Sequence, residues 1–171
     1  MSDTVDLPGS AGDSNWNVSH DLVVVGSGAA GLTAALVAAD LGLSVVVIES
    51  CEVIGGTTAV SGGAVWVPAN HHLEALDYAD SIADAERYLA ETLDDEFDPA
   101  MVRAYLETGP ALIRYMEEHS RLRFRPGPLP DYYSDLPGGK DRYRALDPLP
   151  LPARELGPDI DLLRPPHPQT V

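Results

Sequence analysis

The sequence predicts an α/β protein whose first element pair is parallel. A valine-rich run at residues 21–25 is followed by a glycine-rich turn and then by an alanine- and leucine-rich stretch. A second short apolar run, residues 44–48, comes directly after that stretch. Strand, glycine turn, helix and strand within about 30 residues make a βαβ unit of Rossmann type.

Each element of this unit has its own local signal. Residues 21–25 form a continuous apolar run bounded by glycine, which predicts a buried parallel strand. Residues 28–41 contain good helix formers and no proline, and Gly42 follows as a helix terminator. Residues 44–48 repeat the pattern of the first strand and predict its parallel partner.

Helices are expected next. Apolar residues recur at helical spacing from 80 to 93, with Asp80 or Ser81 as the N-cap. Asp98 followed by Pro99 predicts the start of another helix, which Gly109-Pro110 should break. A third helix is then expected from residue 110 to about residue 119.

The last part of the chain predicts little regular structure. Residues 121–125 alternate arginine with apolar residues, as in a half-exposed strand. From Pro126 onward the chain holds 11 of its 15 prolines and is expected to be irregular. The predicted organisation is a disordered acidic tail at 1–18, a nucleotide-binding region with a helical insertion at 19–125, and a proline-rich segment at 126–171. So few parallel strands indicate an incomplete domain of a larger protein, the alternative being a short protein with an irregular tail.

Composition excludes several function classes. A net charge of −16 excludes a nucleic-acid-binding surface, which needs a basic patch. No apolar run approaches the roughly 20 residues of a membrane span, so no transmembrane segment is expected. Cys51 is the only cysteine, and residues 1–17 lack the features of a secretory signal, which together favour a reducing, cytoplasmic location.

The first glycine-rich turn, GSGAAG, has the spacing of a dinucleotide fingerprint between strand and helix. Gly26 permits the tight turn, Gly28 lets the backbone approach a pyrophosphate, and Gly31 lets the helix pack close to the strand. Glu49, at the tip of the second strand, is positioned to accept hydrogen bonds from ribose hydroxyls and disfavours the 2′-phosphate of NADP. The cofactor-binding residues expected here are Gly26, Ser27, Gly28, Ala29, Ala30, Gly31, Glu49 and Ser50.

A second glycine-rich turn follows the second strand and favours FAD over NAD. Its glycines allow positive φ and close backbone approach, and its hydroxyls can donate to phosphate oxygens or to the edge of a flavin ring. An NAD domain would normally continue directly into its next helix. The residues expected to bind FAD in this turn are Gly55, Gly56, Thr57, Thr58, Ser61, Gly62 and Gly63.

This second turn resembles the flavin loop of the fumarate reductase/succinate dehydrogenase flavoprotein superfamily. Some members attach FAD through a histidine, and the matching position lies near Gly56, so the resemblance implies non-covalent FAD. Within the superfamily, the stretch Gly55–Pro68, the segment 129–135 and the glycines near residue 138 look like the 3-ketosteroid Δ1-dehydrogenase branch. The resemblance covers roughly residues 20–150.

The resemblance implies a substrate and one catalytic residue. Desaturation beside a ketone removes an α proton and a β hydride, and flavin N5 accepts the hydride. Tyr132, with Tyr133 as the alternative, corresponds to the tyrosine that assists the base, while the base itself would lie beyond Val171. The expected substrate is a 3-oxosteroid, and an external electron acceptor would reoxidise the flavin. Alternatives are a fumarate reductase-type enzyme, a 3-ketosteroid Δ4-dehydrogenase or an inactive FAD-binding fragment; the isolated chain is expected to be inactive.

Four other residues have structural explanations that are favoured over functional ones. Trp66 is expected in the core rather than on a ligand. Cys51 is expected to be a small buried apolar residue. His71 and His72 are expected to form an exposed polar pair at a helix start.

Overall fold

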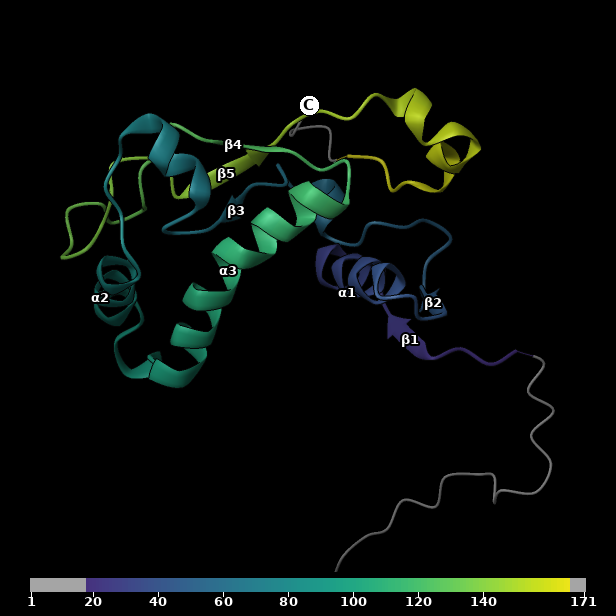
Figure 1. Ribbon diagram of the computed structural model, residues 1–171, viewed down its shortest axis with the longest axis horizontal. Helices are drawn as coiled ribbons and strands as arrows, with labels where there is room; N and C mark the ends of the chain where they lie inside the picture. The colour runs from purple at the N-terminus through teal and green to yellow at the C-terminus, as the bar shows by residue number, and fades with distance from the viewer. Residues whose placement is uncertain (1–17, 167–171) are drawn as a thin grey trace, which may run out of the picture. The chain divides into compact units, whose positions relative to one another are not determined.

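The computed structural model describes residues 18–166, which divide into two compact units with the boundary between Ser50 and Cys51. Figure 1 shows the elements of both units, each of which is described by itself below. Of the tail predicted to be disordered, residues 1–17 lie outside the described residues. Within the described part of the chain, no helix is long and apolar enough to cross a membrane.

The first unit is the predicted βαβ unit. Strand β1 spans Leu22–Val25, helix α1 spans Ala29–Asp40, and strand β2 spans Val45–Ile48. The two strands pair in parallel, with Leu22 opposite Val45. Gly42 follows the helix with a φ of +84°, a conformation that glycine adopts without strain. The predicted fold class is therefore confirmed.

The prediction that β1 is a buried strand is correct for only one of its faces. Val24 is buried, whereas Val23 and Val25 are 53% and 84% exposed, and Ile48 on β2 is 53% exposed. The reason is that the described residues supply only two strands and one helix to this sheet. A single helix covers a single face, so the side chains that alternate to the other face stay in solvent.

The second unit begins with short 3₁₀ turns and then has two packed helices. The 3₁₀ helices η1 and η2 span Thr58–Val60 and His71–Leu76. Helix α2 spans Ile82–Leu93 and is followed by the 3₁₀ helix η3 at Asp94–Glu96. Ser81 is the N-cap of α2, since its side chain accepts a hydrogen bond from the Asp84 backbone N–H at 3.0 Å. The carboxylate of Asp80, the other expected cap, instead accepts hydrogen bonds from the Arg144 guanidinium.

Helix α3 runs without interruption over Pro99–His119, so the predicted break at Gly109-Pro110 is wrong. A proline inside a helix costs about 3 kcal/mol. Buried side chains of α3 lie on both sides of the proline, at Val102 and Leu106 before it and at Ile113 and Met116 after it. Packing along this single stripe outweighs the local penalty. Gly109 lies on the same stripe: a Cβ there would come within 3.3 Å of Val67 Cγ1, so glycine permits the close approach.

The region after Pro126 contains a strand that the sequence did not predict. Strands β3 (Val65–Trp66), β4 (Phe124–Pro126) and β5 (Ala145–Pro148) form an antiparallel sheet in the order β3-β5-β4. Strand β5 ends on a proline at Pro148, where its missing N–H is tolerated. The alternation at 121–125 predicted β4 only in part, because the strand begins at Phe124.

The C-terminal segment is also more ordered than predicted. Two 3₁₀ helices span Ala153–Glu155 and Gly157–Leu162. After them the chain pairs in parallel with Ile54, which donates from its N–H to the Leu162 carbonyl at 2.7 Å and accepts from the Arg164 N–H at 2.8 Å. Residues more than 100 positions apart in the sequence thus meet directly before the second glycine-rich turn.

Two apolar clusters hold the second unit together. One joins Val67, Ile113 and Leu146, with Val65 and Phe124 packed against it. The other joins Ala85, Val102 and Leu106. Helix α3 contributes to both clusters, which explains why it continues past Pro110. Figure 1 shows α3 as the longest element of the unit.

Candidate functional site

The first glycine-rich turn has the geometry that its spacing predicts. Gly26 has a φ of +96°, and its N–H donates to the Ile48 carbonyl at 2.7 Å. A Cβ on Gly31 would come within 2.0 Å of the Gly26 carbonyl oxygen and 3.3 Å of Val24 Cγ1. Only glycine allows this contact between helix and turn. The predicted packing role of Gly31 is confirmed.

Glu49 is attached to this turn. Its Oε2 accepts hydrogen bonds from the Ser27 N–H at 3.0 Å and from the Ser27 hydroxyl at 2.5 Å, and Ser27 is 1% exposed. Ser50 donates from its hydroxyl to Glu49 Oε1 at 3.2 Å. The carboxylate predicted for ribose therefore lies at the tip of β2 against the turn predicted for pyrophosphate. Ser27 orients that carboxylate through its hydroxyl, a contact that the sequence pattern did not indicate.

The second glycine-rich turn is built by backbone conformation and by Ser61. Gly55, Gly56 and Gly63 have φ angles of +114°, +54° and +73°. The Ser61 hydroxyl donates to the Thr58 carbonyl at 2.9 Å and accepts from the Gly63 N–H at 3.0 Å. The turn is therefore held in place while Thr57, Thr58 and Ser61 remain exposed.

Gly62 differs from the other glycines of this turn. Its φ lies outside the left-handed region, and a Cβ added there would meet no atom within 4 Å. Neither backbone conformation nor packing therefore requires glycine at this position. Glycine has no side chain, so a ligand in the open space next to Gly62 could approach the backbone closely. The residues of this turn thus fit a nucleotide cofactor.

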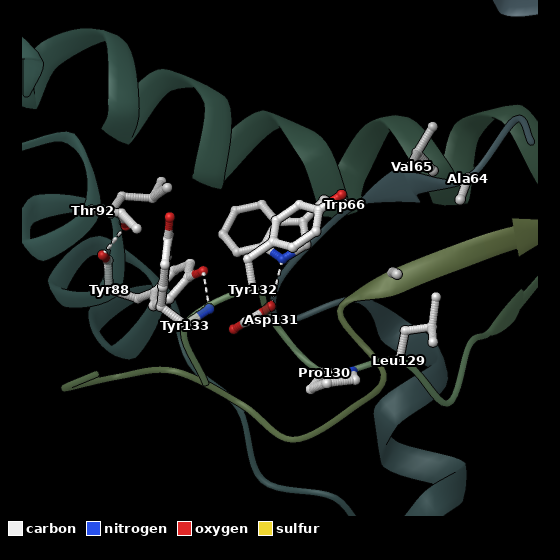
Figure 2. Close-up of a pocket in the computed structure, with 12 residues that line it drawn as sticks. Ala64, Val65, Trp66, Tyr88, Thr92, Leu129, Pro130, Asp131, Tyr132 and Tyr133 are labelled. Atoms are coloured by element: carbon white, nitrogen blue, oxygen red, sulfur yellow. Dashed lines mark hydrogen bonds between the residues drawn. The ribbon is translucent and has the colours of Figure 1, made fainter. Parts of the chain in front are cut away.

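An apolar cavity of about 430 Å³ lies between β3, α2 and the loop before β5. Figure 2 shows Trp66 above Asp131 and Tyr132, with Tyr88 and Tyr133 next to each other. Tyr132 is 99% exposed and Tyr133 57%. The Tyr133 backbone N–H donates to the Tyr88 hydroxyl at 3.4 Å, which attaches the loop to α2. The cavity thus brings the predicted catalytic Tyr132 next to two aromatic side chains.

A buried guanidinium contacts two of the residues that line the cavity, Asp131 and Trp66. Arg144 is 1% exposed and donates from Nε and Nη2 to the two carboxylate oxygens of Asp80, at 3.0 and 2.7 Å. Its Nη1 donates to Asp131 Oδ2 at 2.8 Å. Burial by itself lowers the pKa of Arg144, but the hydrogen bonds and charges of Asp80 and Asp131 outweigh burial and raise it. Arg144 therefore stays charged.

This network fixes the wall of the cavity. Asp131 Oδ1 accepts the Trp66 indole N–H at 2.7 Å, which Figure 2 shows as a dashed line. The Arg144 guanidinium carbon lies 5.6 Å from the Trp66 ring centroid and 5.8 Å from that of Tyr88, within cation–π range. Tyr132 follows Asp131 directly in the chain. The buried ion pair therefore anchors the residue that directly precedes Tyr132.

Sequence reasoning missed Arg144 and the role of Asp80. Asp131 was singled out only as part of a motif, and the partners lie 13 and 64 positions from Arg144, so no local pattern connects them. Arg144 directly precedes β5 and follows Lys140 and Arg142, so the local sequence does not distinguish it from these neighbouring basic residues. Trp66, predicted for the core, is half-buried: it packs against the apolar cluster of Ala85, Val102 and Leu106 and also lines the cavity.

Two of the structural explanations favoured from the sequence are wrong. The Cys51 side chain is exposed rather than buried. His71 and His72 begin η2 but are only 21% and 23% exposed, and both contact Glu117 of α3. Burial, with the charge of neighbouring His72 and Arg114, lowers the pKa of His71 against the opposing effect of Glu117.

The sequence profile of the family described as "FAD binding domain" matches residues 21–159. The chain belongs to this family. It is 43% identical over 150 residues to a 3-oxosteroid 1-dehydrogenase of Mycolicibacterium smegmatis, covering 86% of this chain and 26% of that protein. It is 40% identical to a 4-oxocyclohex-2-ene-1-carboxylate 5-dehydrogenase of Sinomonas cyclohexanicum, covering 88% of this chain and 25% of that protein.

A solved structure matches as well. The 3-ketosteroid Δ1-dehydrogenase of Sterolibacterium denitrificans, in complex with 1,4-androstadiene-3,17-dione, superposes with a TM-score of 0.83 at 39% identity. The match covers 89% of this chain and 27% of that one. The predicted resemblance to this branch is confirmed. The chain spans about a quarter of the length of these relatives.

Proposed function

We propose that this chain forms the FAD-binding N-terminal part of a 3-ketosteroid Δ1-dehydrogenase-like flavoenzyme. The observation that carries the proposal is the apolar, aromatic cavity beside Tyr132. Of the described residues that line it, none is Lys, Arg or His, and four are Trp or Tyr. Such a lining suits a rigid apolar ring system that carries a ketone.

The proposed cofactor is non-covalent FAD. Its pyrophosphate would contact the backbone N–H groups of the Gly26–Gly31 turn at the start of α1, and its ribose would contact Glu49. The open space over Gly62 and the exposed hydroxyls of Thr57 and Thr58 support contact with the second turn. Bound FAD would supply the hydride acceptor of the reaction.

Tyr132 is proposed to assist removal of the α proton. Its ring is exposed at the cavity, and its backbone is anchored through Asp131 to Arg144 and Trp66. The phenolic oxygen of a tyrosine at this position can help the base of the complete enzyme to take the proton. In a longer protein, further residues would cover Tyr132 and exclude water. Tyr133 is the alternative, and its backbone contact with Tyr88 is the weaker anchor at 3.4 Å.

A second substrate class is favoured by one relative. The Sinomonas enzyme is named for a smaller ring that carries a carboxylate. Desaturation beside a ring ketone would use the same proton and hydride transfers, but the carboxylate needs a cationic partner. The cavity lining lacks one within residues 18–166. A dicarboxylate of the fumarate type would likewise need cationic partners from the remaining part of a longer protein. The apolar, aromatic lining present here suits the 3-oxosteroid, which is the substrate that we propose.

The proposal includes an external electron acceptor and a reducing, cytoplasmic location. The exposed thiol of Cys51 supports the second point, since exposed thiols persist in their reduced form there.

The test is a chimera that joins this chain to the remaining part of the Mycolicibacterium relative. We expect yellow, flavin-loaded protein that desaturates androst-4-ene-3,17-dione with a dye as acceptor. Tyr132→Phe should lower kcat by about 10²-fold or more without loss of the flavin spectrum, as expected for a proton-transfer residue. Tyr133→Phe is measured in parallel, and a fall of kcat in that variant instead would assign the role to Tyr133. Equal kcat for the chimera and its Tyr132→Phe variant removes Tyr132 from the reaction.

The isolated chain is expected to bind FAD weakly or not at all and to show no turnover. Equilibrium dialysis with FAD and the same dye-coupled assay measure both properties. Turnover of the steroid by the isolated chain would contradict this expectation.

A further inference from the structure

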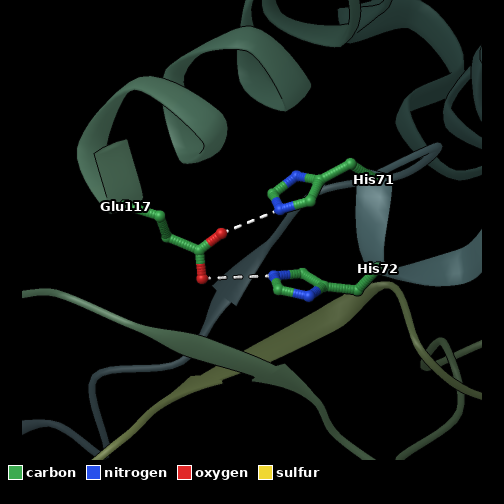
Figure 3. A group of neighbouring side chains, drawn as sticks. All are labelled: His71, His72 and Glu117. Carbon is green, nitrogen blue, oxygen red and sulfur yellow. Dashed lines mark ion pairs between the residues drawn. The ribbon is translucent and has the colours of Figure 1, made fainter. Parts of the chain in front are cut away.

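Two histidines and a glutamate meet away from the cavity and from both glycine-rich turns. His71 and His72 are the first residues of η2, and Glu117 lies in the last turn of α3. Figure 3 shows both imidazole rings directed at the same carboxylate. His71 Nε2 lies 2.8 Å from Glu117 Oε2, and His72 Nε2 lies 3.3 Å from Oε1. The mechanism proposed above uses none of the three.

The surroundings hold this cluster in a fixed geometry. Asn70, the residue before the pair, is 3% exposed and donates from its side chain to the carbonyls of Val67 at 2.8 Å and Tyr143 at 3.1 Å. Glu117 Oε1 accepts the Phe124 backbone N–H at 2.8 Å. The bond from Phe124 orients the Glu117 carboxylate, and the bonds of Asn70 fix the backbone directly before His71. Such supporting hydrogen bonds also orient the ligands at metal centres.

The hydrogen bonding inside the cluster is incomplete. His72 Nε2 is buried and makes no hydrogen bond within the described residues, although it lies against the carboxylate. His71 Nδ1 is also buried without a hydrogen-bond partner there. Buried polar atoms without partners are uncommon and need an explanation. A bound cation would supply the missing partner of His72 Nε2.

We propose that His71, His72 and Glu117 bind one divalent transition-metal cation, with Zn²⁺ as the best fit. Their donor atoms lie within 4.8 Å of one another. A tetrahedral Zn²⁺ with ligands at about 2.05 Å separates those ligands by about 3.3 Å, so small side-chain adjustments complete the site. Two imidazoles and one carboxylate suit Zn²⁺ and its transition-metal neighbours better than Ca²⁺ or Mg²⁺.

The consequence is a cross-link between η2 and the end of α3, next to β4. The three side chains are 12–23% exposed, which leaves room for a water as the fourth ligand and for entry of the ion. The site would stabilise the second unit wherever the cation is available, because an ion bound only by the folded state favours that state.

The experiment uses the 171-residue chain with Cys51→Ser, which removes the only thiol. Zn²⁺ is titrated against a chromophoric chelator, and Co²⁺ is added separately to record visible d–d absorption. We expect one equivalent bound, at least 10-fold weaker Zn²⁺ binding in His72→Gln and in Glu117→Gln, and no change in His119→Ala. His119 is the matched control, since it lies on α3 two residues from Glu117 and stacks on Tyr115 instead.

A second measurement needs no substitution and therefore tests the proposal even if the variants fail to fold. In the unsubstituted chain, the ring resonances of His71 and His72 should shift on addition of Zn²⁺, while those of His119 should not. Unchanged resonances of His71 and His72, or Zn²⁺ affinity that is equal in His72→Gln and the parent chain, would overturn the proposal.

Discussion

Replacement of Arg144 by methionine tests the buried network most directly. The change keeps most of the apolar volume and removes three charge-assisted hydrogen bonds, two to Asp80 and one to Asp131. Both carboxylates are left in place with side chains that are 0% and 2% exposed. Breaking a buried ion pair by removal of one partner costs about 3–5 kcal/mol.

The remaining contacts place the expected loss toward the lower end of that range. Asp80 keeps the N–H groups of Ala69 and Ser81, and Asp131 keeps those of Trp66 and Lys140. A loss of about 3 kcal/mol is a large part of the 5–15 kcal/mol that stabilises an ordinary domain. With a urea m-value of about 2 kcal/mol/M, the unfolding midpoint should fall by about 1.5 M.

The assay is urea unfolding followed by fluorescence of Trp66 in a Trp16→Phe background, so that one indole reports. Arg142→Met is the matched control, because Arg142 lies two residues away with an exposed side chain paired to exposed Asp141. Such a surface pair contributes about 0–1 kcal/mol. Equal midpoints for the Arg144→Met and Arg142→Met variants would refute the argument that the buried guanidinium holds this region together.

Two further predictions concern the glycines and a tyrosine. Gly31→Ala places a Cβ within 2.0 Å of the Gly26 carbonyl and should lower the unfolding free energy by about 1–3 kcal/mol, while Gly62→Ala should leave it unchanged and weaken FAD binding only in the chimera. Calorimetry and flavin titration separate the two effects, and equal destabilisation by both would contradict the packing argument. Burial, with the hydrogen bond to Asp141, raises the pKa of Tyr78 to about 12. The neutral phenol therefore contributes stability that is fully present below the unfolded pKa of about 10 and is lost as the pH rises toward 12. Parallel pH curves of unfolding free energy for the parent and Tyr78→Phe would show that this contribution is absent.

The first unit and the cofactor class follow from patterns within short stretches of the sequence. A valine run, a glycine turn at fixed spacing and an alanine-rich helix are signals within about 30 residues, so the βαβ unit and the role of Gly31 could be predicted. The caps of α2 and α3 were predictable for the same reason, since Ser81 and Asp98 act on N–H groups two or three residues away.

The second unit depends on contacts between residues far apart in the sequence. Helix α3 continues through Pro110 because Leu106 and Ile113 are buried in different clusters, and neither contact is visible in local propensity. Strand β5 forms in a proline-rich segment because β3 and β4 pair with it from far away in the sequence. The burial of Arg144 also depends on partners that are distant in the sequence, Asp80 and Asp131. For this reason its neighbours in the sequence did not predict that it is buried. Pairing and packing between residues tens of positions apart carry the energy there, and a sequence pattern reports only on residues close together in the chain.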